Sequence, residues 1–190
     1  MRRRELIALV PALGLAACAH TVRPPALQLP ALKLAPASLG ASLSLAQRLT
    51  VRELPSGAGE TAAEHSIDVQ LQIDAQALRL AAFALNQRVM TIVWDGRELQ
   101  VQRHPMLPAE VDAARVLRDI QLCYWPLDAV RGALPEGWTL DDERSRRVLS
   151  HEGSPQVVID YGADPHWQGR AELDNRAEGY RLSIESTTTE

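Results

Sequence analysis

The stretch Ile67-Asp68-Val69-Gln70-Leu71-Gln72-Ile73-Asp74 alternates apolar and polar side chains without interruption. Successive side chains of a β-strand point to opposite faces, so the four apolar residues would share one face and the Asp and Gln residues the other. The stretch therefore predicts a strand with one wet face and one buried face. A buried face needs further strands or a helix to cover it.

Strand-like patterns lie on both sides of this stretch, at residues 43–52, 78–85, 88–94 and 97–103. Residues 78–85 are mostly apolar, so the pattern favours a strand there but leaves a helix open. Asp95-Gly96 predicts a hairpin with a type I′ turn, because that turn requires positive φ at both central positions. Four or five antiparallel strands would thus precede any helix.

A helical pattern follows, in which Ala113, Val116, Leu117 and Ile120 lie three and four residues apart. A second, short helix is expected over 127–134, between Pro126 and Pro135. Strands are expected again at 144–151, 156–161, 167–173 and 180–185. We therefore expect an α+β fold, in which a curled antiparallel β-sheet forms an open half-barrel and two central helices cap an apolar cavity.

The N-terminal residues have the organisation of a signal peptide. Three arginines at positions 2–4 precede the apolar run Leu6–Leu15, which is too short to span a bilayer comfortably, and Leu15-Ala16-Ala17-Cys18 follows. We expect a signal peptide at 1–17, a lipidated Cys18 with a Pro/Ala/Leu tether at 18–40, one domain at 41–186 and a disordered tail at 187–190. An ordinary secreted protein with a chance cysteine near its cleavage site is the alternative.

Leu15, Ala16, Ala17 and Cys18 resemble the bacterial lipobox. The resemblance implies that diacylglycerol is attached to the Cys18 thiol, that cleavage precedes this residue, and that acyl chains then anchor the protein in a membrane. Position 19 is Ala and not Asp. The resemblance therefore implies delivery to the outer membrane, with the domain on the periplasmic side.

The charge balance argues against a nucleic-acid partner. The chain has 20 basic and 24 acidic residues, and cleavage would remove three arginines and one glutamate, leaving 17 against 23. Phosphate neutralisation needs a basic stripe, which the sequence lacks.

No motif in the sequence indicates an enzyme, a metal site or a cofactor. Histidines 65, 104, 151 and 166 are scattered without metal-ligand spacing, and residues 160–166 have the composition of a hairpin loop. Cys123 lies between large apolar residues and is expected to be a buried, inert thiol without a disulfide partner. We therefore expect a protein that is not an enzyme, although an esterase or thioesterase with a spatially assembled site stays an open alternative.

The cavity-lining candidates are mostly aromatic. They are Phe83, Trp94, Leu117, Ile120, Tyr124 and Trp125. Ordinary core packing is the alternative interpretation of the aromatic residues.

The order of strands, helix, Tyr124-Trp125-Pro126-Leu127, short helix and strands resembles the outer-membrane lipoprotein receptor of the Lol sorting pathway (LolB-like). The chain is also similar to a group of proteobacterial lipoproteins encoded among fatty-acid or aryl-polyene synthesis genes. The Lol resemblance implies a half-closed barrel that receives acyl chains. The candidate for that receptor's protruding loop with an exposed leucine is Pro105-Met106-Leu107-Pro108.

These expectations lead to two functions. The first is an outer-membrane lipoprotein that binds or transfers an acyl-chain or polyene-type lipid. The second is a structural or assembly accessory that binds an envelope protein partner through a sheet edge.

Overall fold

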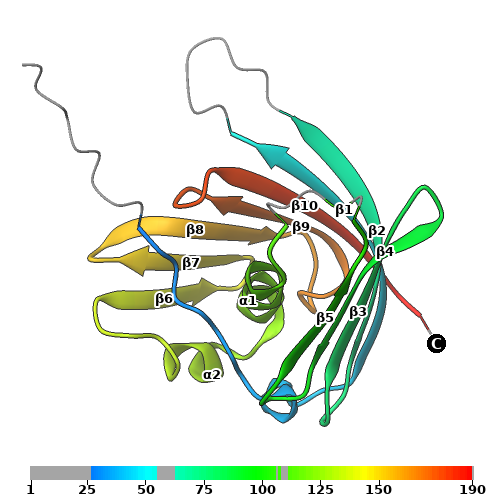
Figure 1. The fold of residues 1–190 in the computed structure, drawn as a ribbon. Helices are drawn as coiled ribbons and strands as arrows, with labels where there is room; N and C mark the ends of the chain where they lie inside the picture. The colour runs from blue at the N-terminus through cyan, green and yellow to red at the C-terminus, as the bar shows by residue number, and fades with distance from the viewer. Residues whose placement is uncertain (1–26, 55–62, 106, 108–110, 190) are drawn as a thin grey trace, which may run out of the picture.

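One antiparallel sheet contains all ten strands of the described chain, in the order β5-β4-β3-β2-β1-β10-β9-β8-β7-β6 (Figure 1). The computed structural model describes residues 27–54, 63–105, 107 and 111–189. The strands are β1 (Leu43–Glu53), β2 (Glu64–Ile73), β3 (Leu78–Ala84), β4 (Gln87–Trp94), β5 (Leu99–Arg103), β6 (Trp138–Glu143), β7 (Arg146–His151), β8 (Ser154–Tyr161), β9 (Gly169–Asn175) and β10 (Tyr180–Thr188). The remaining elements are the 3-10 helix η1 (Pro36–Leu39), α1 (Ala113–Tyr124) and α2 (Leu127–Arg131).

The sheet is curled but open. Strands β1 to β5 form one wing and β6 to β10 the other, and the pairing of β1 with β10 joins them. Helix α1 lies in the concavity between the two wings (Figure 1). Because β5 and β6 stand at opposite ends of the strand order, the barrel does not close.

The expected open antiparallel sheet is confirmed, whereas the α+β class is corrected to mostly β. The two α-helices of the described residues have only 12 and 5 residues. α2 ends at Arg131 and not at 134. Strand β6 was missed because its side chains are mainly polar, as suits a strand at a sheet edge.

The turn chemistry also differs from the prediction. Trp94 pairs with Leu99, so the β4–β5 loop has four residues, and the Asp95 side chain accepts hydrogen bonds from the backbone N–H groups of Arg97 and Glu98. The two-residue turn with positive φ at both positions is instead Leu85-Asn86, with φ of 49° and 61°. The hairpin at Asp95-Gly96 is confirmed, but its type I′ turn is wrong because an Asx turn replaces it.

Both predicted domain boundaries shift. β10 continues to Thr188, and Thr189 N–H donates to the Ser44 carbonyl at 2.9 Å, so residues 187–189 join the sheet and do not form a disordered tail. At the other end, Leu29, Leu32 and Leu39 are buried in the core. The second half of the expected tether therefore belongs to the folded domain.

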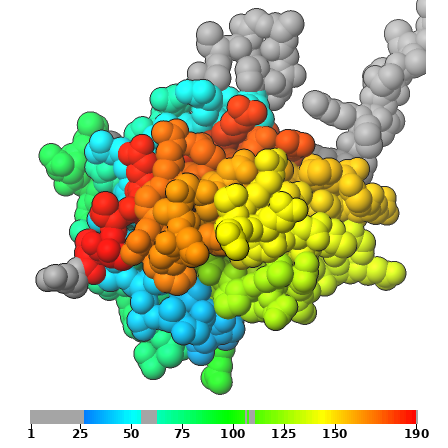
Figure 2. Space-filling view, turned by 180° about the vertical axis from the view of Figure 1, so that it is seen from behind, coloured from blue at the N-terminus to red at the C-terminus, as the bar shows by residue number. Residues whose placement is uncertain are grey.

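The core fills the space between the two wings and α1. Its largest fully buried side chains are Trp94, Trp125, Leu32, Leu45, Leu71, Ile73, Leu78, Ile92, Leu117, Leu122, Leu140 and Leu149. Seen from behind, strands of the C-terminal half form a continuous outer surface, with the N-terminal segment in blue below them (Figure 2).

Candidate functional site

A row of apolar side chains crosses the concave face of five neighbouring strands. The register joins them in the order Leu45, Leu71, Leu80, Ile92 and Val101. Directly paired residues of an antiparallel ladder point to the same face, so all five face inward. The first four are buried, but Val101 is 43% exposed. The apolar face thus continues one strand beyond the part of the sheet that is covered.

Helix α1 has hydrogen-bonding partners at both ends. Its first turn is capped by the Asp112 carboxylate, which accepts from the Ala114 N–H at 2.8 Å. Beyond its last turn, the buried Arg147 guanidinium on β7 donates to the carbonyls of Leu122 and Trp125 at 2.6 and 2.9 Å. A cation here satisfies helix-end carbonyls and complements the helix dipole.

Two faces of α1 differ in burial. Leu117 and Leu122 are buried in the core. Ala113, Val116 and Ile120 lie three and four residues apart, pack against the same core and stay partly exposed. This second stripe is an apolar surface within the concavity that the protein does not fully cover.

The structure places five of the six expected lining residues in or against the core. Trp94, Leu117, Tyr124 and Trp125 are buried, and Ile120 is partly exposed. Phe83 does not join them: it pairs with Asp68, and its inward neighbour in the chain is the buried Ala82. Strand alternation therefore puts Phe83 on the outer face.

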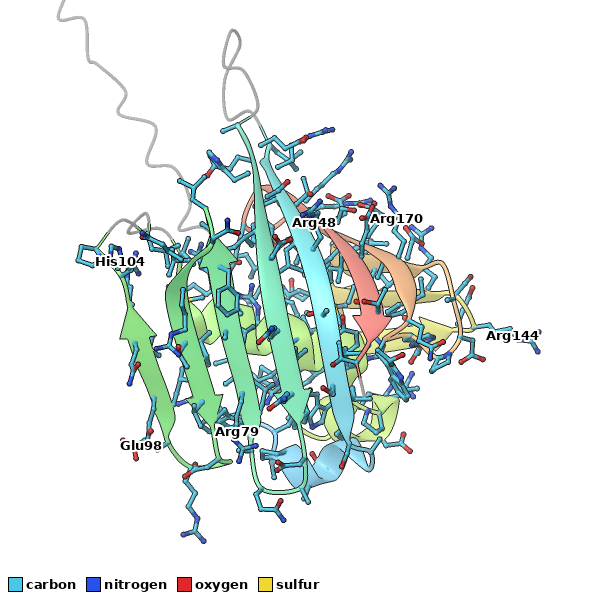
Figure 3. All side chains as sticks on the ribbon, turned by 90° about the vertical axis from the view of Figure 1, so that its right-hand side faces the viewer. Arg48, Arg79, Glu98, His104, Arg144 and Arg170 are labelled. Carbon is cyan, nitrogen blue, oxygen red and sulfur yellow. The ribbon has the colours of Figure 1, made fainter. Side chains whose placement is uncertain are left out.

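The outer face carries an open hollow of about 830 Å³ whose lining includes Phe83, Arg48, Asp68 and Arg170. Arg48 and Arg170 project outward from β1 and β9 (Figure 3). Arg48 pairs with Asp68 at 3.0 Å and Arg170 with Glu172 at 2.6 Å, and all four side chains are exposed. These charges form a solvated outer surface, in which the ion pairs contribute little to stability.

An N-terminal strap, defined here as residues 27–39, packs onto the inner side of the domain. The Gln121 side chain on α1 bonds both backbone groups of Leu34: its oxygen accepts from the N–H at 3.2 Å and its nitrogen donates to the carbonyl at 3.1 Å. Trp94 Nε1 donates to the same carbonyl at 2.8 Å. Trp125 Nε1 donates to Ser38 Oγ at 2.9 Å. The two buried tryptophans thus use their polar atoms to hold the strap.

A buried ionic cluster joins α1 to the β9–β10 hairpin. Arg118 donates to the carboxylates of Asp119 and Glu178 at 2.7–3.0 Å, and Tyr180 Oη donates to Asp119. Burial raises the pKa of Asp119, an effect that the charge of Arg118 opposes. Burial by itself would raise the pKa of Glu178. The hydrogen bond from Arg118 opposes this effect and holds the pKa of that carboxyl below its usual value. The cluster orients the helix, and its opposite charges pair with one another.

Cys123 is buried, as the sequence predicts. Burial raises the pKa of its thiol, so the thiolate that a nucleophile requires is disfavoured at neutral pH. A second buried polar group lies close by: Gln47 Nε2 donates to Tyr124 Oη at 2.7 Å and to Ser186 Oγ at 2.8 Å. Gln47, Tyr124 and Ser186 therefore form hydrogen bonds with one another within the core.

In the part of the chain that the structure describes, no group of three or more His, Cys, Asp or Glu side chains has a metal-binding arrangement. His166 stacks on Tyr161 at 3.8 Å, and His151 lies 4.7 Å from Trp138.

Within the same described residues, no helix has the length and apolarity needed to cross a membrane.

Leu15, Ala16, Ala17 and Cys18 lie outside the described residues, as do Met106 and Pro108 of the expected protruding loop. An exposed leucine does occur elsewhere, at the tip of the β3–β4 hairpin, where Leu85 is 88% exposed. Sequence reasoning missed this leucine because the apolar run Leu78–Leu85 was assigned entirely to a strand. It assigned the strap to a tether, although the four leucines of that segment left open that it packs onto the domain or lies near the lipid surface.

Comparison with protein families gives one result. The model of a family described as "Protein of unknown function (DUF3261)" matches residues 44–188, from the first strand to the end of the last. The search of curated proteins found no match.

Proposed function

The chain belongs to the DUF3261 family, and we propose that it is a lipid-anchored binding protein, without enzymatic activity, on the periplasmic face of the outer membrane. Its open sheet would hold the acyl or polyene-type chain of a lipid against the concave face, during binding or transfer. The anchor is the diacylglyceryl group expected on Cys18.

The observation that carries this proposal is the uncovered apolar surface on the concave side. Val101 belongs to the inward row of the sheet but is 43% exposed, and Val116 and Ile120 on α1 are partly exposed. Sites for apolar ligands are concave and are lined mainly by apolar side chains. Contact with an acyl chain would remove the apolar surface of these side chains and of the lipid from water. This burial stabilises the complex by about 25 cal/mol per Å² of apolar area.

A second feature supports contact with a membrane. Leu85 projects from the β3–β4 turn with 88% of its surface exposed, and its turn partner is Asn86. A single exposed leucine is unremarkable by itself. At the tip of a hairpin in a protein that resembles a lipoprotein receptor, it fits the protruding leucine which that resemblance implies.

The test compares two substitutions on β5 that add the same charge to opposite faces of the same strand. Val101→Asp places a carboxylate on the inward row, and Gln100→Asp places it on the outer face, where Gln100 is already exposed. Uptake of cis-parinaric acid, an intrinsically fluorescent polyene fatty acid, is measured by fluorescence titration. We expect Val101→Asp to weaken uptake at least tenfold and Gln100→Asp to change it by less than twofold. Equal uptake by both variants, or none by the unsubstituted chain, would refute the proposal.

A second candidate is an assembly accessory that binds an envelope protein. It is favoured by the packed interior, in which Trp125 and Leu117 are almost completely buried, and by β5, which stands at the end of the strand order of the described sheet. A strand of a partner could extend the sheet at this edge. Absence of fatty-acid uptake, together with an envelope protein crosslinked through β5, would favour this function over lipid binding.

A further inference from the structure

We infer that the acyl-binding groove is the groove now filled by the leucines of the N-terminal strap, and that the strap and the lipid compete for it. This inference rests on the proposed function and adds to it the position of the ligand and a means of regulation. The strap would act as a built-in substitute for the acyl chain and leave when the lipid enters.

The strap is an irregular segment that ends in η1 and places a series of apolar side chains in the interior. Leu29, Leu32 and Leu39 are 8%, 2% and 5% exposed and belong to the main core cluster. Pro36 is buried beside them, whereas Gln28, Ala31 and Lys33 are exposed. A segment that inserts a series of aliphatic side chains into the core occupies the kind of space that a hydrocarbon chain would fill.

The strap is held differently from the strands. No backbone-to-backbone hydrogen bond links residues 27–34 to the described part of the sheet. The specific bonds are gathered at Leu34, Ala35 and Ser38, where Gln121, Trp94 and Trp125 hold the chain. Segments with few backbone hydrogen bonds open locally at lower cost than strands paired on both sides. The strap can therefore leave while the ten-stranded sheet stays intact.

The held end of the strap lies beside the uncovered apolar surface. The Cβ position of Gly96, in the β4–β5 turn, is 3.8 Å from Ala35 Cβ and 3.3 Å from Pro36 Cδ. The strands that this turn joins carry Ile92 and Val101, the last two members of the inward row. The covered part of the groove is thus filled by the strap, and the uncovered part begins at the strand next to it.

The sequence provides a probe of the strap without any substitution in it. Lys33 is the only lysine of the chain, and it is exposed within the strap. Endoproteinase Lys-C cleaves after lysine, so it can cut this chain at a single position. A protease needs several residues around the cut to leave the protein surface, so cleavage reports release of the strap and not exposure of one side chain.

The experiment uses the full chain with Cys18→Ala, so that the buried Cys123 is the one remaining native thiol. Lys-C cleavage is followed by mass spectrometry with and without cis-parinaric acid, while uptake is followed by fluorescence. We expect saturating fatty acid to raise the cleavage rate at least fivefold. Uptake with no change in this rate, or with slower cleavage, would overturn the competition while leaving lipid binding in place. Absence of uptake would refute the proposed function and this inference together.

A disulfide provides the converse test. The distance between the Ala35 and Gly96 Cβ positions suits a disulfide, for which Cβ atoms lie about 3.5–4.5 Å apart. In the variant Ala35→Cys/Gly96→Cys, we expect at least tenfold weaker uptake when oxidised and recovery on reduction. Gly96 has φ of 91°, so the single variant Gly96→Cys controls for backbone strain. Equal uptake by the oxidised and reduced double variant would contradict the inference.

A matched pair of leucines separates competition from general loosening. Leu32 lies in the strap and Leu71 on the centrally placed strand β2, and both are almost completely buried. We expect Leu32→Ala to tighten fatty-acid binding several-fold, because the competitor is weakened, and Leu71→Ala to destabilise the protein without tightening binding. Equal effects of the two substitutions on affinity would argue against a competing strap.

Discussion

Replacing Arg118 with Met should cause one of the largest single losses of stability in this protein. Arg118 is 4% exposed, and its guanidinium makes five hydrogen bonds, two each to Asp119 and Glu178 and one to Tyr180 Oη. Met fills similar space but leaves two carboxylates together without their principal counter-charge. Breaking a buried ion pair from one side costs about 3–5 kcal/mol. In a domain of this size, a loss of that order lowers the melting temperature by about 6–20 °C.

The loss should depend on pH in a defined direction. In the native protein the lowered pKa of Glu178 supplies stability above the carboxyl's unfolded pKa of about 4.3, and this stability is lost as pH falls through the folded value. In the variant, burial without Arg118 raises the pKa of Asp119 further, so protonation removes the repulsion as pH falls. Both effects reduce the difference in stability between the native protein and the variant at acidic pH. The stability difference should therefore be largest near pH 7 and shrink below about pH 5.

Urea unfolding followed by tryptophan fluorescence between pH 4.5 and 7.5 measures this difference. Arg115→Met is the matched control, because Arg115 lies 3.8 Å from Glu178 but is half exposed. We expect the control to lose less than about 1 kcal/mol, as exposed pairs do. A loss below about 1 kcal/mol for Arg118→Met at pH 7, or a loss independent of pH, would refute the view that the cluster depends on its buried charge.

Three further predictions concern other parts of the chain. Burial raises the pKa of all three tyrosines, so the stability they supply below about pH 10 is lost as pH rises, by about 1.4 kcal/mol per tyrosine and pH unit. Tyr161→Phe should make urea-measured stability fall less steeply between pH 9 and 11, and an unchanged slope would count against this view. Gly162→Ala should cost about 1–3 kcal/mol, because its Cβ would lie 2.9 Å from the Arg170 carbonyl oxygen, and a melting temperature equal to that of the native chain would disprove the clash. Cys18→Ala should abolish incorporation of labelled palmitate in cells, since only the thiol can accept the diacylglyceryl group, and persistent labelling would refute the lipobox interpretation.

Much of the sheet could be predicted because alternation is a local property. Polar and apolar residues alternate strictly in the strand around Ile67–Ile73, and the burial of its side chains follows that alternation. β6 could not be found in this way, because an edge strand with Asp141, Asp142 and Glu143 carries little apolar signal. Phe83 was misplaced for a related reason: in a mostly apolar run, the period does not say which face is inner.

The candidate site was predicted only in outline. Trp94, Leu117 and Trp125 were recognised as inner residues because large apolar side chains are buried in most folds. The contact of the two tryptophans with the strap was not predictable, because Trp94 and Leu34 are 60 residues apart in the chain. The polar partners Gln121 and Gln47 carry no pattern that marks them as buried.

The sequence by itself determined nine of the ten described strands, the central helix and the order of these elements, since each follows from the spacing of neighbouring side chains. Tertiary structure alone decided that β1 pairs with β10, that the sheet stays open between β5 and β6, and that the leucines of the strap lie in the core. The physical reason is that periodicity records which side of an element is apolar, whereas pairing and cover depend on surfaces that distant segments bury together.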